Sequence, residues 1–340
     1  MYKSRVVVFA AMAALAAGIV ARPLPAAVPL AAPSPGVVDR TDLSVMTYNV
    51  EGLPFPVVTG RPAALAQIGD NLLNLRQRGL QPHIVALQEA FIPQAKAIAE
   101  RAGYRYVAYG PTGAQAGSVP IDASTVPAYD RYKAQSSWLK GETEGKFVDS
   151  GLVIMSDYPI VASRKMAFPQ DMCAGYDCLA AKGVLVAWVQ VPGHSQPIAI
   201  ADTHLNSRAA SGVAVSRADA AYRLQIAQAR RFLDTNVSPR SDLIFAGDFN
   251  VGHDAQRIAT ANGTGGFLPG SREATMQAAT LTQNRTRDLS LVLSRAKDKQ
   301  YYRPGSASTL TFRSLDVPFG AARGGFSLSD HLGYVVNYAM

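Results

Sequence analysis

Short apolar segments of strand length alternate along this chain with longer segments of helical periodicity, and this alternation restricts the fold more than any other feature. The segments of strand length are Leu43–Tyr48, Ile84–Gln88, Gly151–Met155, Val184–Val191, Ile198–Thr203 and Leu243–Gly247. Between the first two, apolar residues recur at helical spacing from Ala64 to Leu75, and Gly79 follows where a helix would end. Gln94–Ala102 and Arg217–Leu233 are also predicted to be helices. Strands interleaved with helices indicate an α/β protein with layered sheets.

Residues that bind metals or carry protons follow four of these strands directly, which is where α/β proteins place their active sites. The four groups are Asn49 with Glu51, Glu89, Asp202 with His204 and Asn206, and Asp248 with Asn250; Ser329-Asp330-His331 forms a fifth group near the C-terminus. One such residue alone more often caps a turn or a helix. Five groups in one chain favour a common site.

These residue types suit metal-assisted phosphoryl transfer. Carboxylate and amide oxygens hold Mg²⁺ or Mn²⁺, and the cation neutralises a phosphate oxygen. A neutral histidine accepts a proton from water, and a protonated one stabilises developing charge. The scattered histidines disfavour a structural zinc site, and His83, His194 and His253 match no motif. The chain also lacks the P-loop motif of nucleotide hydrolases and the G-x-S-x-G motif of serine esterases.

The N-terminal segment predicts export. Lys3 and Arg5 precede an uncharged apolar run from Val6 to Ala21, so residues 1–21 are expected to be a signal peptide, with the cleavage site between residues 17 and 32. The run corresponds to about 24 Å of helix, less than the ~30 Å of a hydrocarbon core, which disfavours the alternative of a retained membrane anchor. Residues 22–38 are a Pro/Ala-rich linker, and residues 39–340 are expected to form one domain. The protein is therefore expected to be secreted or periplasmic.

Composition excludes some classes of protein but does not identify a substrate. With 48% hydrophobic residues and only one long apolar run, the chain is neither disordered nor a multi-span membrane protein. The net charge of +8 suits nucleic acid or an anionic membrane surface, although a basic protein without such a partner fits equally well. Cys173 and Cys178 are five residues apart in a loop, and after export they are expected to form a disulfide rather than stay as two buried thiols.

The polar groups also carry a family resemblance. Six motifs occur in the order Thr47-Tyr48-Asn49, Gln88-Glu89, Ser150-Gly151-Leu152, Thr203-His204-Leu205, Gly247-Asp248-Phe249-Asn250 and Ser329-Asp330-His331. In this order they resemble the endonuclease/exonuclease/phosphatase superfamily from about residue 43 to residue 340. The resemblance implies a DNase I-like four-layer sandwich, in which two packed mixed β-sheets are flanked by helices. It also implies hydrolysis of phosphodiesters or phosphomonoesters with Mg²⁺, for which Mn²⁺ or Co²⁺ can substitute.

The resemblance implies roles for individual residues on the metal side of the site. Glu89 is expected to be the principal metal ligand, with Asn49 beside it. Asp248 and Asn250 are expected to orient the attacking water and the phosphate. Asp330 is expected to support the metal region.

It also implies a base and phosphate contacts. His331 matches the general base, and His204 and Asn206 are expected to contact the phosphate. The base is expected to lean on an aspartate from a strand shortly upstream. Asp288, just before an apolar run from Leu289 to Leu293, is the candidate, and Asp316 competes with it.

Within the superfamily, the segment from Asp177 to Gly183 resembles an Asp-x4-Lys-Gly element of neutral sphingomyelinases, which places Asp177 and Lys182 near the phosphate. A solvated loop pair is the alternative. The resemblance implies hydrolysis of sphingomyelin to ceramide and phosphocholine at a membrane surface, with no obligate protein partner. The long aromatic hairpin of some bacterial members is missing, and its scattered substitutes are Tyr301, Tyr302, Phe312, Phe319 and Phe326. A secreted nuclease, a phosphatase of lipid or inositol phosphates, and a non-catalytic binding module remain alternatives.

Overall fold

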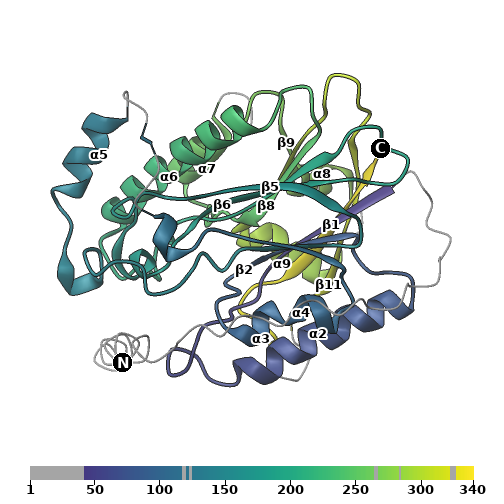
Figure 1. Ribbon diagram of the computed structural model, residues 1–340, viewed down its shortest axis with the longest axis horizontal. Coiled ribbons are helices and arrows are strands. Elements are labelled where there is room, and N and C mark those ends of the chain that lie inside the picture. The colour runs from purple at the N-terminus through teal and green to yellow at the C-terminus, as the bar shows by residue number, and fades with distance from the viewer. Residues whose placement is uncertain (1–41, 117–119, 122–124, 264–266, 283–284, 322–326) are drawn as a thin grey trace.

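The structure is a computed structural model that describes residues 42–116, 120–121, 125–263, 267–282, 285–321 and 327–340 (Figure 1). The predicted signal peptide and linker, and Phe326, lie outside these ranges. Across the described ranges, no helix combines the length and apolar character needed to span a bilayer.

Two mixed six-stranded sheets form the centre of the protein. The first has the order β11 (Thr311–Phe319), β12 (Gly333–Ala339), β1 (Asp42–Asn49), β2 (Ile84–Gln88), β4 (Val153–Ser156) and β3 (Tyr106–Tyr109). The second has the order β5 (Ile160–Ala167), β6 (Gly183–Val189), β7 (Ile198–His204), β8 (Leu243–Asp248), β10 (Asp298–Arg303) and β9 (Arg272–Glu273). β1 pairs with β2 and β7 pairs with β8 in parallel, and the other pairs are antiparallel.

Helices cover the outer faces of both sheets, as Figure 1 shows for α2 below and α6 above. The helices are α2 (Arg61–Gln77), α3 (Pro93–Lys96), α4 (Ile98–Arg101), α5 (Val126–Lys133), α6 (Val215–Asn236), α7 (Ala255–Asn262), α8 (Ala274–Leu281) and α9 (Arg287–Arg295). α2 packs on the first sheet and α6 on the second. The predicted four-layer sandwich is therefore confirmed.

The central strands are buried on both faces, which explains their continuous apolar sequences. In β1, Leu43 and Val45 point into the core between the two sheets. Met46 and Tyr48 point the other way, into the core beneath α2. Each fully buried side chain of this size contributes about 1.5–3 kcal/mol, so the sandwich holds both faces of β1 and fixes where its end lies.

One predicted helix is divided in two, and one segment considered as a strand is helical. The predicted helix Gln94–Ala102 is two short helices, α3 and α4. The run from Leu289 to Leu293 is the helix α9 rather than a strand. The hydroxyl of Thr286 caps this helix by accepting from the backbone N–H of Leu289, and Leu289 and Val292 are buried three residues apart. The apolar run was too short to separate the two periods.

Candidate active site

The carboxyl ends of the two parallel strand pairs meet across the sandwich. Asn49 ends β1, His204 ends β7 and Asp248 ends β8. The Nδ2 atom of Asn49 donates to Glu89 Oε1 at 3.0 Å and to Asp248 Oδ2 at 3.1 Å. One buried amide thus joins a carboxylate of the first sheet to a carboxylate of the second.

Backbone strain is concentrated at these strand ends. Glu89 and Asn250 have φ values of 56° and 49°, in the left-handed region that costs about 1–3 kcal/mol for a residue other than glycine. The residue before Asp248 is Gly247, where a Cβ would lie 2.2 Å from the backbone oxygen of Thr203. β8 can therefore approach β7 this closely only with glycine at position 247.

His331 forms a buried pair with a carboxylate. Its Nδ1 lies 2.9 Å from both carboxylate oxygens of Asp298, the first residue of β10. Its Nε2 lies 3.6 Å from Asp248 Oδ2. Burial opposes protonation of His331, but Asp298 and Asp248 outweigh it and raise the pKa of His331 to about 10.

This pairing corrects the prediction that Asp288 supports His331. Asp288 lies in the first turn of α9, where its carboxylate accepts from the backbone N–H of Ala321 at 3.3 Å. The competing candidate, Asp316, accepts from Asn337 Nδ2 at 2.9 Å on β12. Asp298 reaches the site because it lies opposite Asp248 in the antiparallel register of β10 and β8.

His204 lies between two acidic groups and one lysine. Its Nε2 is 3.6 Å from Asp248 Oδ2, 3.9 Å from Glu89 Oε1 and 3.0 Å from Lys182 Nζ. Burial and then the charge of Lys182 lower the pKa of His204 to about 3. The imidazole is therefore neutral near pH 7, and its partner with the positive charge is Lys182.

Beside His204, the buried Lys182 pairs with the partly buried Asp177, which excludes the alternative of a solvated loop pair. Lys182 Nζ lies 3.1 Å from Asp177 Oδ2 and donates to the backbone oxygen of Leu205 at 3.1 Å. Asp177 also accepts from the backbone N–H of Ser207. The predicted disulfide between Cys173 and Cys178 is present, and it closes the loop that carries Asp177.

Asn206 differs from its prediction as a phosphate-binding residue. It is fully buried, and its Oδ1 accepts from the backbone N–H of Ala174 at 2.8 Å. Its Nδ2 donates to the backbone oxygen of Ser207 at 2.9 Å. The side chain is therefore used to fix the loop that follows His204. The predicted metal-region residue Asp330 is exposed next to His331.

The predicted metal-binding residues lie together, and further ligand atoms lie close to them. Burial raises the pKa of Glu89 to about 7, which marks a carboxylate whose negative charge has little compensation. Asp248, Asp298 and His331 each offer one ligand atom, and these atoms lie within 4.8 Å of one another. Both oxygens of Asp298 already contact Nδ1 of His331.

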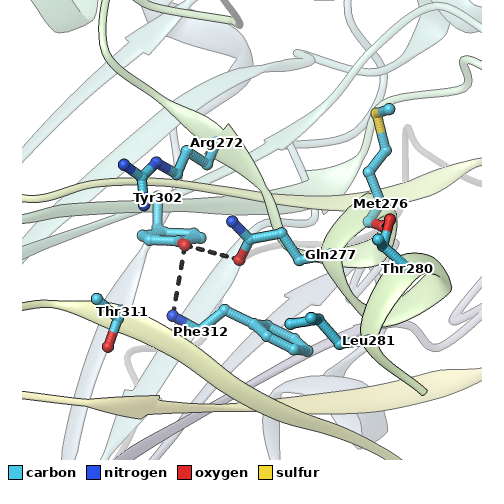
Figure 2. Close-up of a pocket in the computed structure, with 8 residues that line it drawn as sticks. All are labelled: Arg272, Met276, Gln277, Thr280, Leu281, Tyr302, Thr311 and Phe312. Carbon is cyan, nitrogen blue, oxygen red and sulfur yellow. Dashed lines mark hydrogen bonds between the residues drawn. The ribbon is translucent and has the colours of Figure 1, made fainter. Parts of the chain in front are cut away.

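A pocket of about 360 Å³ lies elsewhere, between α8 and strands β9, β10 and β11 (Figure 2). Figure 2 shows that the hydroxyl of Tyr302 is hydrogen-bonded to two of its neighbours: it donates to Gln277 Oε1 at 2.7 Å and accepts from the backbone N–H of Phe312 at 3.4 Å. The opposite end of β10 carries Asp298. The pocket is therefore separate from the residues assembled at the strand ends.

The comparison with protein families agrees with this geometry. The sequence profile described as the Endonuclease/Exonuclease/phosphatase family matches residues 46–331, which is more than half of the chain. The chain belongs to this family. A search of curated protein sequences finds no significant match.

Solved structures of the family share the fold at low identity. Sphingomyelinase C from Streptomyces griseocarneus is 20% identical, with a TM-score of 0.55 over 87% of this chain and 99% of that chain. A humanized D. rerio TDP2 is 16% identical, with a TM-score of 0.56 over 88% and 99%. A beta toxin variant from Staphylococcus aureus with bound magnesium ions is 14% identical, with a TM-score of 0.57 over 88% and 100%. At these identities the likeness shows the endonuclease/exonuclease/phosphatase fold.

Proposed function

We propose that this family member is a divalent-metal-dependent phosphodiesterase and that its substrate is sphingomyelin, cleaved to ceramide and phosphocholine. The observation that carries the proposal is the convergence of Glu89, His204, Asp248 and the His331–Asp298 pair on one point between the sheets. The choice of sphingomyelin rests on the pairing of Asp177 with the buried Lys182 beside His204, and the fold shared with sphingomyelinase C supports it.

The donor set at Glu89 fits a divalent cation. Glu89 and Asp248 both accept a hydrogen bond from the side-chain amide of Asn49. Burial makes the negative charge of Glu89 costly unless a cation lies beside it. Mg²⁺ favours such oxygen ligands. A cation held there would neutralise charge on a phosphate oxygen and on these carboxylates, and it would also favour the neutral form of His331.

His331 accepts the proton of the attacking water in this proposal. Asp298 holds its Nδ1, so its Nε2, which faces Asp248, is the atom that takes the proton. Asp248 and Asn250 orient the water, and Asn250 is fixed by a hydrogen bond from its Nδ2 to the backbone oxygen of Leu205 at 2.9 Å. Holding the water in position lowers the entropy cost of bringing it to the phosphorus in the transition state.

His204 and Lys182 stabilise the negative charge that grows on the phosphate. The lysine is 5% exposed, and in such a dry site its charge is worth more than in water. Asp177 holds Lys182 in place at 3.1 Å, so the two residues act as one unit. The proposal therefore places a buried lysine on the phosphate side of the site.

A nuclease activity is the second candidate, and one observation favours it. The chain carries a net charge of +8, which suits a polyanion. A D. rerio TDP2 complexed with a single-strand DNA product shares the fold at 18% identity and a TM-score of 0.55. In this alternative, basic residues along an open surface bind the backbone, and cleavage depends strongly on salt.

Export of the mature domain is part of the proposal. The basic and apolar N-terminal segment and the Cys173–Cys178 disulfide both suit an oxidising compartment. There the protein would meet phospholipid at a membrane surface without an obligate protein partner. Mass analysis of the secreted chain gives the cleavage position, and a mature protein that still carries residues 1–21 contradicts export by a cleaved signal peptide.

A substrate panel tests the proposal. The chain is assayed with sphingomyelin, phosphatidylcholine, plasmid DNA and inositol phosphates, each with Mg²⁺ and with EDTA. We expect release of phosphocholine from sphingomyelin with Mg²⁺ and none with EDTA. Plasmid nicking at physiological salt without phosphocholine release would favour the nuclease, and inactivity on all substrates would favour a binding module.

A further inference from the structure

We propose that Arg257, a residue outside the catalytic set, positions Asn250 and the loop after His204, and that this role sets the rate of phosphodiester cleavage. The inference rests on the proposed function. Arg257 lies on α7 and is 1% exposed. It is therefore part of the protein interior rather than a contact for substrate, and any effect on the reaction acts through its neighbours.

One nitrogen of Arg257 bonds to both of the loops that follow the second-sheet strands β7 and β8. Its Nη1 donates to the backbone oxygen of Asn206 at 2.9 Å and to that of Asn250 at 2.8 Å. The first oxygen belongs to the loop after β7, and the second to the loop after β8. A single guanidinium thus bridges the loop after His204 and the loop that carries Asn250.

The guanidinium is itself fixed by α6. Its Nε donates to Asp219 Oδ1 at 2.7 Å, and its Cζ lies 4.3 Å from the ring centroid of Tyr222. The backbone N–H of Arg257 also donates to Asp254 Oδ1 at 3.0 Å. A planar group held by an anion, by an aromatic face and at its own backbone has one orientation, which lysine cannot reproduce because its ammonium is a single point charge.

The bonds of Arg257 act where the backbone is strained. Asn250 has a φ of 49°, and its peptide oxygen is one of the two acceptors. The side chain of Asn250 donates to the backbone oxygen of Leu205, which also accepts from Lys182. The effect of Arg257 therefore reaches both the water-orienting side chain and the lysine beside His204.

Arg230 is the matched control for Arg257, because it is an arginine with an ordinary structural role. It lies on α6 and donates to the backbone oxygens of Phe267 at 2.7 Å, Thr260 at 2.8 Å and Ala261 at 2.9 Å. Its Cζ lies 5.0 Å from the ring centroid of Phe267. It thus makes bonds of the same kind to α7 and the segment that follows it, but none of its acceptors belongs to a strand-end loop.

The experiment compares Arg257→Lys with Arg230→Lys at a temperature at which circular dichroism shows both folded. Hydrolysis of the soluble diester bis(p-nitrophenyl) phosphate with Mg²⁺ gives kcat and KM. We expect Arg257→Lys to lower kcat about 10- to 100-fold with KM changed by less than about threefold, because misplacement affects the transition state more than binding. Arg230→Lys is expected to keep kcat within about twofold.

Hydrogen exchange supplies a readout that does not depend on activity. In Arg257→Lys we expect faster amide exchange in residues 204–207 and 248–252, and in Arg230→Lys no change there. Equal kcat values for the two folded variants, or equal exchange in these segments, would overturn the inference. If wild type hydrolyses no phosphodiester, the proposed function fails, and the exchange comparison still decides whether Arg257 holds the loops.

A second variant covers the case in which Arg257→Lys does not fold. Asp219→Asn keeps the arginine and removes the negative charge that fixes its Nε. We expect a loss in kcat of about 3- to 30-fold and faster exchange in the same two segments. Unchanged kcat and unchanged exchange in this variant would also overturn the inference.

Discussion

Replacement of Asp298 by asparagine tests the assignment of the proton-accepting pair. Both carboxylate oxygens of Asp298 lie 2.9 Å from His331 Nδ1. Asp298→Asn keeps the size of the side chain and removes its negative charge. A hydrogen bond with one charged partner contributes about 1.5–3 kcal/mol. At about 1.4 kcal/mol for each tenfold change in rate, its loss predicts a kcat lower by about 10- to 150-fold.

The same variant is expected to change the pH profile. Asp298 helps to raise the pKa of His331, so its removal lowers that pKa. A general base works when it is deprotonated, so we expect the acidic limb of the kcat–pH profile to move to lower pH. The maximum kcat of the profile is expected to be lower than in wild type. Steady-state rates between pH 5 and 9 measure both changes, with circular dichroism as the check on folding.

Asp288→Asn is the matched control, because Asp288 is the residue that the sequence pattern suggested. Its carboxylate bonds to the backbone N–H of Ala321 and not to His331. We expect kcat and the pH profile of this variant to stay at the wild-type level. A normal rate in Asp298→Asn together with a large loss in Asp288→Asn would refute the assignment of the pair.

Three other predictions concern the phosphate side, a buried acid and a buried histidine. Lys182→Ala is expected to lower kcat on sphingomyelin about 10- to 1000-fold with little change in fold, and a loss of less than threefold would contradict its role. Burial raises the pKa of Asp202 well above its usual range, so the folded chain holds this proton more tightly than the unfolded chain and loses stability as pH rises above about 4. Asp202→Asn, which can still accept from Gln88, should therefore raise the melting temperature at pH 7 and less so at pH 4, and an equal gain at both would contradict this. His83 accepts from the backbone N–H of Ser44 through Nδ1, and burial lowers its pKa, so the free energy of unfolding should fall as pH drops below about 6.5. Urea unfolding of wild type and His83→Asn at pH 7.5 and 5 measures this, and parallel losses in both proteins would remove His83 as the cause.

The sequence was sufficient to predict residues that follow buried strands. Asn49, Glu89, His204 and Asp248 each lie at or directly after the end of a mostly apolar segment of strand length, and parallel neighbours end at the same edge of a sheet. The fold class followed from the same alternation. Because these side chains are placed by the strands that carry them, their meeting needed no knowledge of loops.

Asp298 could not be predicted in this way. It begins a strand whose first residues are Asp-Lys-Gln, so no apolar run marks the element. Its position depends on the antiparallel register between β10 and β8, which is a property of the folded sheets. The apolar run from Leu289 to Leu293 pointed instead to Asp288, the residue before it. That run lies in the helix α9, whose first turn is capped by Thr286.

The role of Asn206 was misjudged for a related reason, and the burial of two aromatic residues could not be predicted either. A polar residue beside His204 is expected to face the phosphate, but backbone groups of Ala174 and Ser207 use its amide. Tyr301 and Tyr302, considered as substitutes for a membrane-binding hairpin, are buried in the core. Long-range partners of loop residues and the depth of a side chain are set by tertiary packing, which local pattern does not contain.

The central claim is that Glu89 holds a divalent cation for phosphodiester hydrolysis, and Glu89→Gln tests it most directly. The amide keeps the shape of the carboxylate and its place beside Asn49 but removes the charge. The measurement is the rate of phosphocholine release from sphingomyelin across a Mg²⁺ titration, with EDTA as the zero point. We predict Mg²⁺-dependent release by wild type and a loss of at least about a thousandfold in the folded variant at saturating Mg²⁺. Near-normal release by the variant at saturating Mg²⁺ would contradict the account.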